Sequence, residues 1–341
     1  MNFEEYKEWR EGVLVANDIP SENRFDCLNP FKAMDFTRRW GNDLLALQIS
    51  VRQAAQMWSI GHFSKISPDG LHLEPTRGVR SALGALFERM QERGMELWLP
   101  EDVYPFYKQE AATRAPQLAI RYFKTIPDVD FAEIDTASQN AALLITDPLS
   151  PTGRFLTKKE RSRLAKWTKG GANRWALFDS VYLYDWKIPS HFVEDMHRAH
   201  FVHLFSMSKS YLLRGVFGLA IGDDVGGAWW KGLDLEPTAE TCAAVLDAFS
   251  VDPFMPETQR TIFDSEWARR EHKLTKYGGS VGDAGSGYFR RVHVNFEKAL
   301  KEDGLLLVPA SVFGSSNMDW SIATCLYEAA WQHKLSQEIG L

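Results

Sequence analysis

Residues 141–153 read AALLITDPLSPTG, an apolar run of strand length that ends in a turn made rigid by two prolines and a glycine. A second strand-like run, WALFDSVYLYD, occupies 175–185, and a third, FVHLFSMS, occupies 201–208. Stretches with helical character lie before and between these runs, at 81–94 and, on a basic background, at 158–171. Short apolar strands separated by helices predict an α/β fold, with a mostly parallel sheet and helices on both faces.

Further elements extend this pattern in both directions along the chain. Strands are also predicted at 71–75, 96–100 and 217–222, and a helix is predicted at 42–60. Beyond Gly222 the order changes: helices are predicted at 237–250, 255–277 and 297–304, and strands at 287–296, 305–309 and 320–325. A mixture of this kind suits a smaller α+β lobe.

The composition is that of an ordinary globular protein. Of the 341 residues, 45% are hydrophobic and 25% are charged, which excludes an intrinsically disordered chain. The formal net charge of −6 argues against nucleic acid or an anionic membrane as a partner. The three cysteines form no disulfide framework, and neither a targeting segment nor an apolar run of membrane-spanning length is visible. These observations predict a cytoplasmic protein.

Lys209 is the first candidate for chemistry, in the segment SMSKSYLLRG at 206–215. Lysine is costly to bury, so a lysine directly after a buried-type strand has two interpretations. It is either a solvated loop residue or a nucleophile that forms a Schiff base. In the second case, Ser206, Ser208 and Arg214 would hold an anion such as a phosphate.

Asp179 is the second candidate, because it lies inside the apolar strand ALFDSVYLYD at 176–185. An isolated buried carboxylate is very costly, so Asp179 either caps the next turn or pairs with a buried cationic nitrogen. Tyr182, three residues later, is either a core tyrosine or a ligand to a cofactor oxygen.

Two further loops follow predicted strands. TRGVRSAL at 76–83 places a glycine where a strand gives way to a helix, a junction that offers backbone N–H groups to an anion. PEDVYPFY at 100–107 is aromatic, which core packing and stacking on a ligand explain about equally well. The sequence contains no metal-ligand spacing, no G-x-S-x-G turn and no P-loop, so no metal site is predicted.

Taken in order, these motifs resemble those of the fold-type-I pyridoxal 5′-phosphate (PLP) enzymes, within the class I and II aminotransferase family. That family has a glycine turn before a helix, then P-x-x-x-Y, N-P-x-N-P-T-G, D-x-x-Y and S-x-S-K. The corresponding segments here are TRGVRSAL, PEDVY, DPLSPTG, DSVY and SMSK. GYFRRVHV and LLLVPASVFG extend the resemblance toward the carboxyl terminus.

The resemblance implies an architecture as well as a cofactor. We expect a large PLP-binding domain at 40–230 with a mostly parallel seven-stranded sheet. A smaller α+β domain would combine 1–39 with 231–341. Members of this family are usually homodimers, so the resemblance also implies a homodimer whose substrate is a small molecule, an amino acid or an amine.

The resemblance further implies a role for each matching residue. Lys209 forms the Schiff base with PLP and moves a proton, while Asp179 pairs with the pyridinium nitrogen. Tyr182 and Ser150 contact the phenolate oxygen, and Tyr104 stacks on the ring. The phosphate is bound by the N–H groups around Gly78, Val79 and Arg80, together with Ser206, Ser208 and Arg214.

Departures from the family pattern leave the reaction open. Asp147 and Ser150 stand where the family has asparagines, and the segment NMDWSIATC at 317–325 lacks the family's carboxylate-binding arginine. A substrate carboxylate could be bound from another direction, or the substrate lacks one at that place. The arginines that could bind it are Arg77, Arg290 and Arg291.

The first expectation is a PLP-dependent aminotransferase that acts on an amino acid or a related amine. The alternative is a PLP-dependent lyase, decarboxylase or cyclase that acts on a specialised amino acid. A third interpretation, a non-catalytic protein of this fold that senses a ligand, is opposed by the joint presence of Lys209, Asp179 and Tyr182. The identity of the substrate and the pathway does not follow from the sequence.

Overall fold

A computed structural model describes most of the two sheets and the helices packed on them. The described residues are 1–16, 43–62, 71–126, 128–183, 195, 198, 200–206, 217–223, 237–251, 264, 267–268, 271–278, 289–315 and 319–324. Within these residues, no helix is both long enough and apolar enough to cross a membrane.

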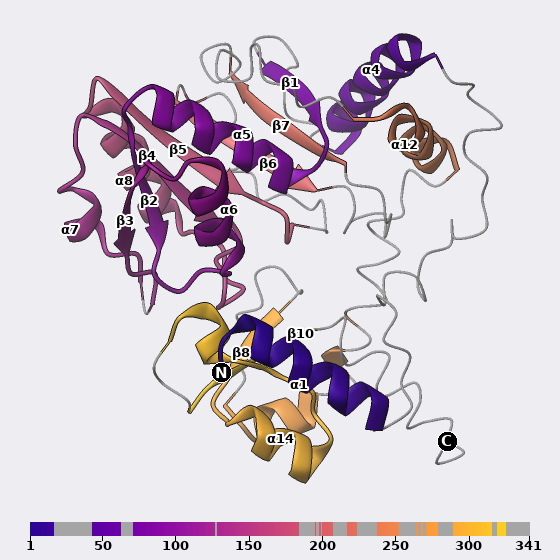
Figure 1. Ribbon diagram of the computed structural model, residues 1–341, viewed down its shortest axis with the longest axis vertical. Helices are drawn as coiled ribbons and strands as arrows, with labels where there is room; N and C mark the ends of the chain where they lie inside the picture. Colours follow the sequence, from indigo (N-terminus) through magenta and orange to yellow (C-terminus); the bar gives the residue numbers. More distant parts are fainter. Residues whose placement is uncertain are drawn as a thin grey trace.

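A seven-stranded sheet forms the larger part of the structure (Figure 1). Its strands stand in the order β1-β7-β6-β5-β4-β2-β3. Their bounds are β1 (Leu71–Thr76), β2 (Glu96–Pro100), β3 (Ala119–Phe123), β4 (Asn140–Thr146), β5 (Asn173–Asp179), β6 (Phe201–Ser206) and β7 (Gly218–Asp223). The neighbours from β3 to β6 pair in parallel, whereas β7 is antiparallel to both β6 and β1. The predicted mostly parallel seven-stranded sheet is confirmed.

Helices cover both faces of this sheet. On one face lie α5 (Val79–Glu92) and α6 (Phe106–Arg114), whose buried side chains share a core cluster with strands β2 and β5. On the other face lie the short α7 (Phe131–Ile134) and α8 (Lys158–Lys169). At the β1 end of the sheet, α4 (Leu44–His62) packs against α12 (Ala239–Val251) (Figure 1). The predicted α/β layering is therefore confirmed.

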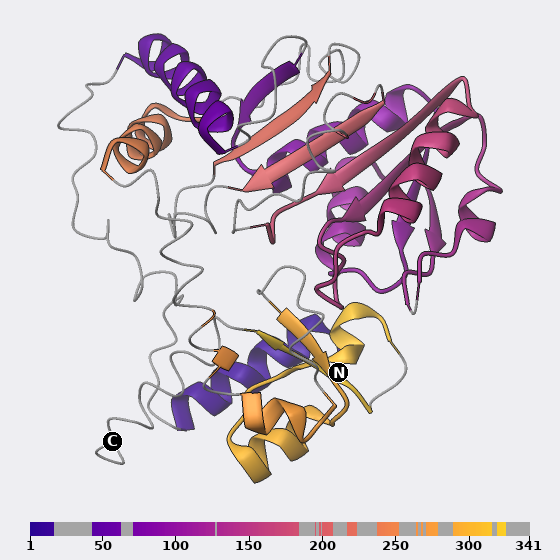
Figure 2. The same cartoon turned by 180° about the vertical axis from the view of Figure 1, so that it is seen from behind.

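A second, three-stranded antiparallel sheet has the order β8-β10-β9. It consists of β8 (Phe289–Val292), β9 (Val308–Pro309) and β10 (Ser321–Thr324), accompanied by α14 (Phe296–Asp303) and the 3₁₀ helix η1 (Ala310–Phe313). The amino-terminal helix α1 (Phe3–Ala16) lies beside this sheet in both views (Figures 1 and 2). Trp9 of α1 meets Phe296 edge to face, with ring centroids 4.8 Å apart.

Helix α1 and the segment 289–324 thus share one small core, whereas α12 lies against α4. Residues 17–42 and 224–236, which contain the predicted boundaries, lie outside the described residues. The boundaries of the two domains at 40–230 stay a prediction.

One strand and three helices of the described chain escaped the sequence analysis, namely β3, α1, α6 and α7. β3 has the sequence AIRYF, and only Phe123 among its residues is buried, because β3 is the edge strand. α6 follows the aromatic loop PEDVY and buries Tyr107 and Ala111. In addition, the predicted strand at 305–309 is shorter than expected, since only Val308 and Pro309 pair in the sheet.

The strand register gathers the candidate residues at one edge of the large sheet. Thr146 at the end of β4 lies opposite Asp179 at the end of β5. Gly218 at the start of β7 pairs with Ser206 on one side and with Thr76 on the other. Ligands of α/β proteins bind at the carboxyl ends of parallel strands, which is the edge where these residues lie.

Candidate active site

The turn between β1 and α5 has the geometry expected of an anion site. Gly78 has φ of 100°, a left-handed conformation that favours glycine, and its N–H donates to Thr76 Oγ1 at 3.2 Å. Val79 and Arg80 then begin α5, whose amino terminus receives no side-chain cap from the residues that the structure describes. An uncapped helix amino terminus carries a partial positive charge and attracts phosphate.

Gly218 lets strand β7 approach this turn closely. A Cβ atom at Gly218 would lie 2.8 Å from Thr76 Oγ1 and 3.2 Å from Gly78 Cα, both tighter than ordinary contacts. Ser206, the partner of Gly218 in the sheet, is buried at the same place. The structure therefore brings the predicted phosphate residues Gly78 and Ser206 to one corner of the sheet edge.

Asp179 ends β5 as a buried carboxylate with two hydrogen-bond donors. Its side chain is only 3% exposed, Oδ1 accepts the N–H of Val181 at 2.9 Å, and Oδ2 accepts the hydroxyl of Tyr107 at 2.5 Å. Burial raises the pKa of Tyr107 well above its ordinary value, and the negative charge of Asp179 adds to this effect. Tyr107 is therefore protonated and donates its hydroxyl to the Asp179 carboxyl group.

Tyr107 is a site residue that the sequence analysis missed. It lies on α6, in the same PEDVYPFY segment as Tyr104, and its N–H donates to the carbonyl of Tyr104 at 3.3 Å. The available signal was that Tyr107 lies three residues after Tyr104 in the same aromatic segment. The distance in sequence from Tyr107 to Asp179 concealed their contact.

Tyr104 and Tyr182 lie between the two sheets. Both pack against the core cluster of the small sheet, and the Tyr104 ring meets Phe3 of α1 edge to face at 5.0 Å. Tyr182 is close enough to Tyr107 to contribute to its raised pKa. The structure thus groups the predicted ring-stacking residue and the predicted phenolate ligand with Asp179.

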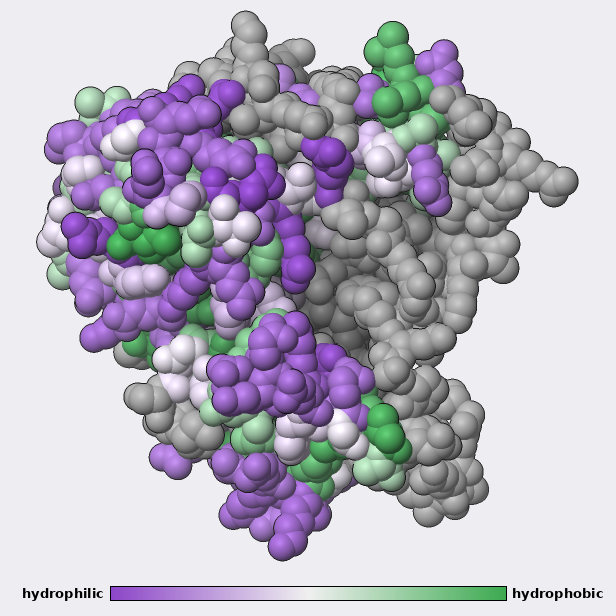
Figure 3. Space-filling view, viewed as in Figure 1, coloured by the Kyte–Doolittle hydropathy of each residue, from purple (hydrophilic) through white to green (hydrophobic). Residues whose placement is uncertain are grey.

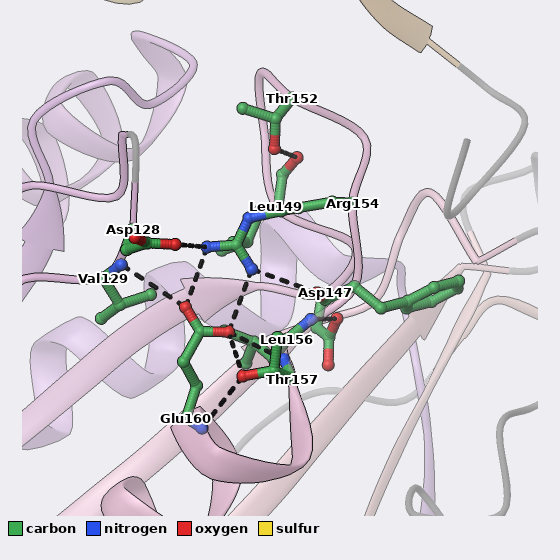
Figure 4. A network of polar contacts seen from close by, with 10 residues as sticks. Asp128, Val129, Asp147, Leu149, Thr152, Arg154, Leu156, Thr157 and Glu160 are labelled. Atoms are coloured by element: carbon green, nitrogen blue, oxygen red, sulfur yellow. Dashed lines mark hydrogen bonds and ion pairs between the residues drawn. The ribbon is translucent and has the colours of Figure 1, made fainter. Parts of the chain in front are cut away.

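Ser150 lies in the loop between β4 and α8, and this loop is held by several polar contacts (Figure 4). The Ser150 N–H donates to Thr146 Oγ1 at 2.7 Å, and its side chain is buried. Arg154 forms a bidentate pair with Glu160, at 3.0 and 2.8 Å. Thr157 and Glu160 also form a capping box at the start of α8.

Glu160 is ionised in this network. Its burial acts to raise its pKa, but the hydrogen bonds from Arg154 and Thr157 outweigh that effect and hold the pKa below its ordinary value. These contacts hold the carboxyl-terminal part of the Ser150 loop, residues 154–157, against the start of α8.

Three predicted residues, Ser208, Lys209 and Arg214, lie outside the described residues. β6, the strand that leads to them, ends at Ser206 on the same edge of the sheet as Asp179. Their roles stay predictions. Among the residues that are described, no group of three or more histidine, cysteine or acidic side chains could hold a metal ion.

The described residues fit the chemical groups of PLP. A buried carboxyl group, Asp179, suits a protonated pyridine nitrogen. The uncapped amino terminus of α5 suits a phosphate. Tyr182 and Ser150 follow the carboxyl ends of β5 and β4, and hydroxyl groups suit a phenolate oxygen.

The arginines that were candidates for binding a carboxylate differ in their surroundings. Arg290 is buried, its guanidinium lies 4.2 Å from the ring of Trp267, and it pairs with Glu271 at 3.6 Å. Arg291, the next residue of β8, projects to the opposite face and lies over the ring of Trp320 at 4.6 Å. Arg291 thus covers Trp320, which directly precedes β10.

Arg291 is also close to the aromatic loop after β2. Burial raises the pKa of Asp102, neighbouring Glu101 adds to the rise, and the positive charge of Arg291 acts against it. Of the two adjacent arginines, Arg291 is thus the one on the side of the loop that carries Tyr104.

Comparisons with known proteins agree with this geometry. A sequence model for the family "Aminotransferase class I and II" matches residues 73–316, well over half of the chain. No curated protein matches the sequence significantly.

Among solved structures, an aspartate aminotransferase from Thermotoga maritima superposes with a TM-score of 0.69 at 18% identity, covering 98% of this chain and 96% of its own. Escherichia coli YbdL, for which a methionine aminotransferase function was identified, gives 0.68 at 16% identity, with 83% and 81% covered. A PLP-bound C–S lyase from Staphylococcus hominis gives 0.67 at 14%, with 94% and 93% covered. At these identities the likeness shows the fold.

Proposed function

We propose that this chain, which belongs to the aminotransferase class I and II family, transfers an amino group at the edge of the large sheet where β4, β5 and β6 end. As a member of that family it is a PLP-dependent enzyme. The observation that carries the proposal is the buried carboxylate of Asp179, to which Tyr107 and the amide of Val181 donate hydrogen bonds. The proposed substrate is an amino acid or a related amine.

Each residue of the edge has a distinct task in this proposal. When bound, PLP supplies an electron sink that stabilises negative charge on the substrate α carbon. Asp179 keeps the ring nitrogen protonated, and Lys209 holds the cofactor and moves the proton at the α carbon. Tyr182 and Ser150 orient the phenolate oxygen, and Tyr104 covers the ring. The phosphate is held by Gly78, Val79, Arg80, Ser206, Ser208 and Arg214.

The proposal is tested by reduction and peptide mapping of the purified protein. PLP is added, the absorbance spectrum is recorded, and borohydride then fixes the cofactor to the protein. The expected result is a label on the peptide that contains Lys209, and conversion of the cofactor to its pyridoxamine form on titration with amino acids. Absence of both a visible band and a labelled lysine would reject the proposal.

Trp320 is the observation that favours a second candidate, a lyase, decarboxylase or cyclase for a specialised amino acid. It is buried and lies in the segment 317–325, where the resemblance implies a carboxylate-binding arginine and the sequence has none. In that case the pyridoxamine form would not accumulate when an amino acid is added. The titration therefore separates the two reactions.

We also propose that Arg291 binds the substrate carboxylate from β8. Arg291→Gln is expected to raise KM for an α-amino acid by about tenfold to a hundredfold, since a hydrogen bond to a charged group contributes about 1.5–3 kcal/mol. Steady-state kinetics measure the change, with a decarboxylated amine as the comparison substrate.

Arg121→Gln, at an exposed position on β3, is the matched control and should leave KM unchanged. Equal losses by Arg291→Gln on the amino acid and on the amine would contradict a carboxylate-binding role.

We propose, finally, that the protein is a cytoplasmic homodimer. Leu44, Leu45 and Ile49 of α4 are exposed and form an apolar patch, the green area over α4 in Figure 3. A patch of this kind suits an interface between two copies. Sedimentation should give twice the chain mass of 38.8 kDa, with the protein recovered in the cytoplasmic fraction; a monomer or a secreted protein would contradict this.

A further inference from the structure

A cluster of four charged side chains, three of them buried, lies on the α8 face of the large sheet. Arg161 of α8 is 2% exposed and forms ion pairs with Asp147, at the end of β4, and with Asp195. Asp195 also accepts Arg198 Nε at 2.9 Å. The Arg161 guanidinium lies over the ring of Phe178, the neighbour of Asp179 in β5.

Such a cluster is costly to bury. Burial lowers the pKa of Arg161 to about 10, and raises the pKa of Asp195 although two arginines oppose that rise. A buried ion pair adds little net stability compared with an apolar replacement, so stability alone is a weak reason for its presence. A role in fixing a particular conformation is better attested.

Asp147 connects this cluster to the loop that carries Ser150. Its Oδ1 accepts the N–H of Leu156 at 3.1 Å, which ties the beginning of the loop to its end. Its own N–H donates to the carbonyl of Asp179 at 3.0 Å. Between these points the N–H of Leu149 donates to the carbonyl of Arg154 at 2.7 Å.

We propose that Arg161 is a positioning residue for Ser150. By neutralising Asp147 in the dry interior, Arg161 holds residues 147–156 in one conformation and so aims the Ser150 hydroxyl at the cofactor. The inference rests on the proposed function, because that function gives Ser150 its role. It implies that Asp147 and Arg161 act as a unit, so that removing one charge is worse than removing both.

The first test uses the cofactor-free protein. Arg161→Met leaves Asp147 without its cation and is expected to lower Tm by about 5–10 °C. Adding Asp147→Asn should restore most of this loss, because Asp195 keeps Arg198 and the asparagine oxygen still accepts the Leu156 N–H. Hydrogen exchange in the 147–156 peptide should quicken at least about tenfold in Arg161→Met and return toward the wild-type rate in the double variant.

Arg163→Met is the matched control. Arg163 lies on the same helix, but its pair with Asp135 is at the surface, so Tm and loop exchange should hardly change. If Arg161→Met and the double variant lose equal Tm, the two residues do not act as a unit and the proposal fails. If Arg161→Met does not fold, Arg161→Lys takes its place, and its Tm and loop exchange are compared with those of the double variant.

The second test asks whether Arg161 acts through Ser150. Arg161→Met should weaken PLP binding by about tenfold to a hundredfold, the size of one hydrogen bond to a charged oxygen. In a Ser150→Ala background the same substitution should weaken binding no further. Equal weakening in both backgrounds would reduce Arg161 to a structural role and overturn the proposal.

The two tests separate this inference from the proposed function. If the wild-type protein binds no PLP, the proposed function and the role of Ser150 fall together. The loop exchange in the cofactor-free protein would still report whether Arg161 and Asp147 hold residues 147–156.

Discussion

Asp179→Asn is expected to lower kcat/KM by about 150-fold to 5,000-fold. The carboxylate is 3% exposed, so its charge is little screened by water, and a neutral amide there would leave a ring cation unpaired. Removing one partner of a buried ion pair costs about 3–5 kcal/mol, which corresponds to that loss of rate. The fold should persist, because the amide oxygen can still accept the hydroxyl of Tyr107. Steady-state kinetics with PLP in excess measure the effect.

Asp130→Asn is a suitable control for this variant. Asp130 caps α7 through the N–H groups of Ala132 and Glu133, and asparagine is an equally good cap. The control should retain wild-type kinetics. An Asp179→Asn enzyme within about tenfold of wild type would show that the ring nitrogen does not depend on this carboxylate.

Tyr107→Phe is expected to lower kcat/KM by about tenfold to a hundredfold. The substitution removes a hydrogen bond to a charged acceptor, which contributes about 1.5–3 kcal/mol, and leaves one oxygen of Asp179 with no donor from Tyr107. The phenyl ring fills the same space in the core beneath α5 and α6, so the loss is specific to the hydroxyl. Kinetics and the equilibrium dissociation of PLP measure it.

The raised pKa of Tyr107 sets the pH range of this effect. A phenol whose pKa is higher in the folded than in the unfolded protein stabilises the fold fully below the unfolded value of 10.0, and this contribution is lost only as pH rises through the folded value. The difference in the free energy of unfolding between wild type and Tyr107→Phe should therefore be constant across neutral pH. Tyr122→Phe, at an exposed position of β3, should have no effect, and a matching loss there would refute the assignment.

The parts of the fold that the sequence predicted are those with the strongest burial pattern. β4, β5 and β6 are buried almost throughout, so their apolar runs stand out. β3 has one buried residue, Phe123, and an edge strand with polar side chains resembles a loop in sequence. Leu305–Leu307 are buried yet pair with no strand among the described residues, which local composition could not reveal.

The sequence predicted those candidate site residues that belong to motifs in a recognisable order along the chain. Asp179 and Tyr182 follow one strand, and Gly78 marks a turn, so motif order places them. Tyr107 and Arg161 were missed for another reason: each acts on a residue that is distant in sequence. Arg161 is one of several basic residues of α8, and only the folded structure distinguishes it from Arg163, which lies at the surface.

The pairing of β1 with β7 has a consequence for biosynthesis. Leu71 pairs with Asp223 and Thr76 with Gly218. β1, the first strand of the large sheet to be synthesised, therefore cannot pair with β7 until β7, the last strand of that sheet, has been synthesised. At roughly 5–20 residues per second this delay is on the order of ten seconds. During that interval the turn at Gly78 lacks its contact with Gly218 of β7. A nascent chain halted before residue 218 should therefore form the parallel part of the sheet, from β2 to β6, but not the proposed phosphate site at Gly78 and Ser206.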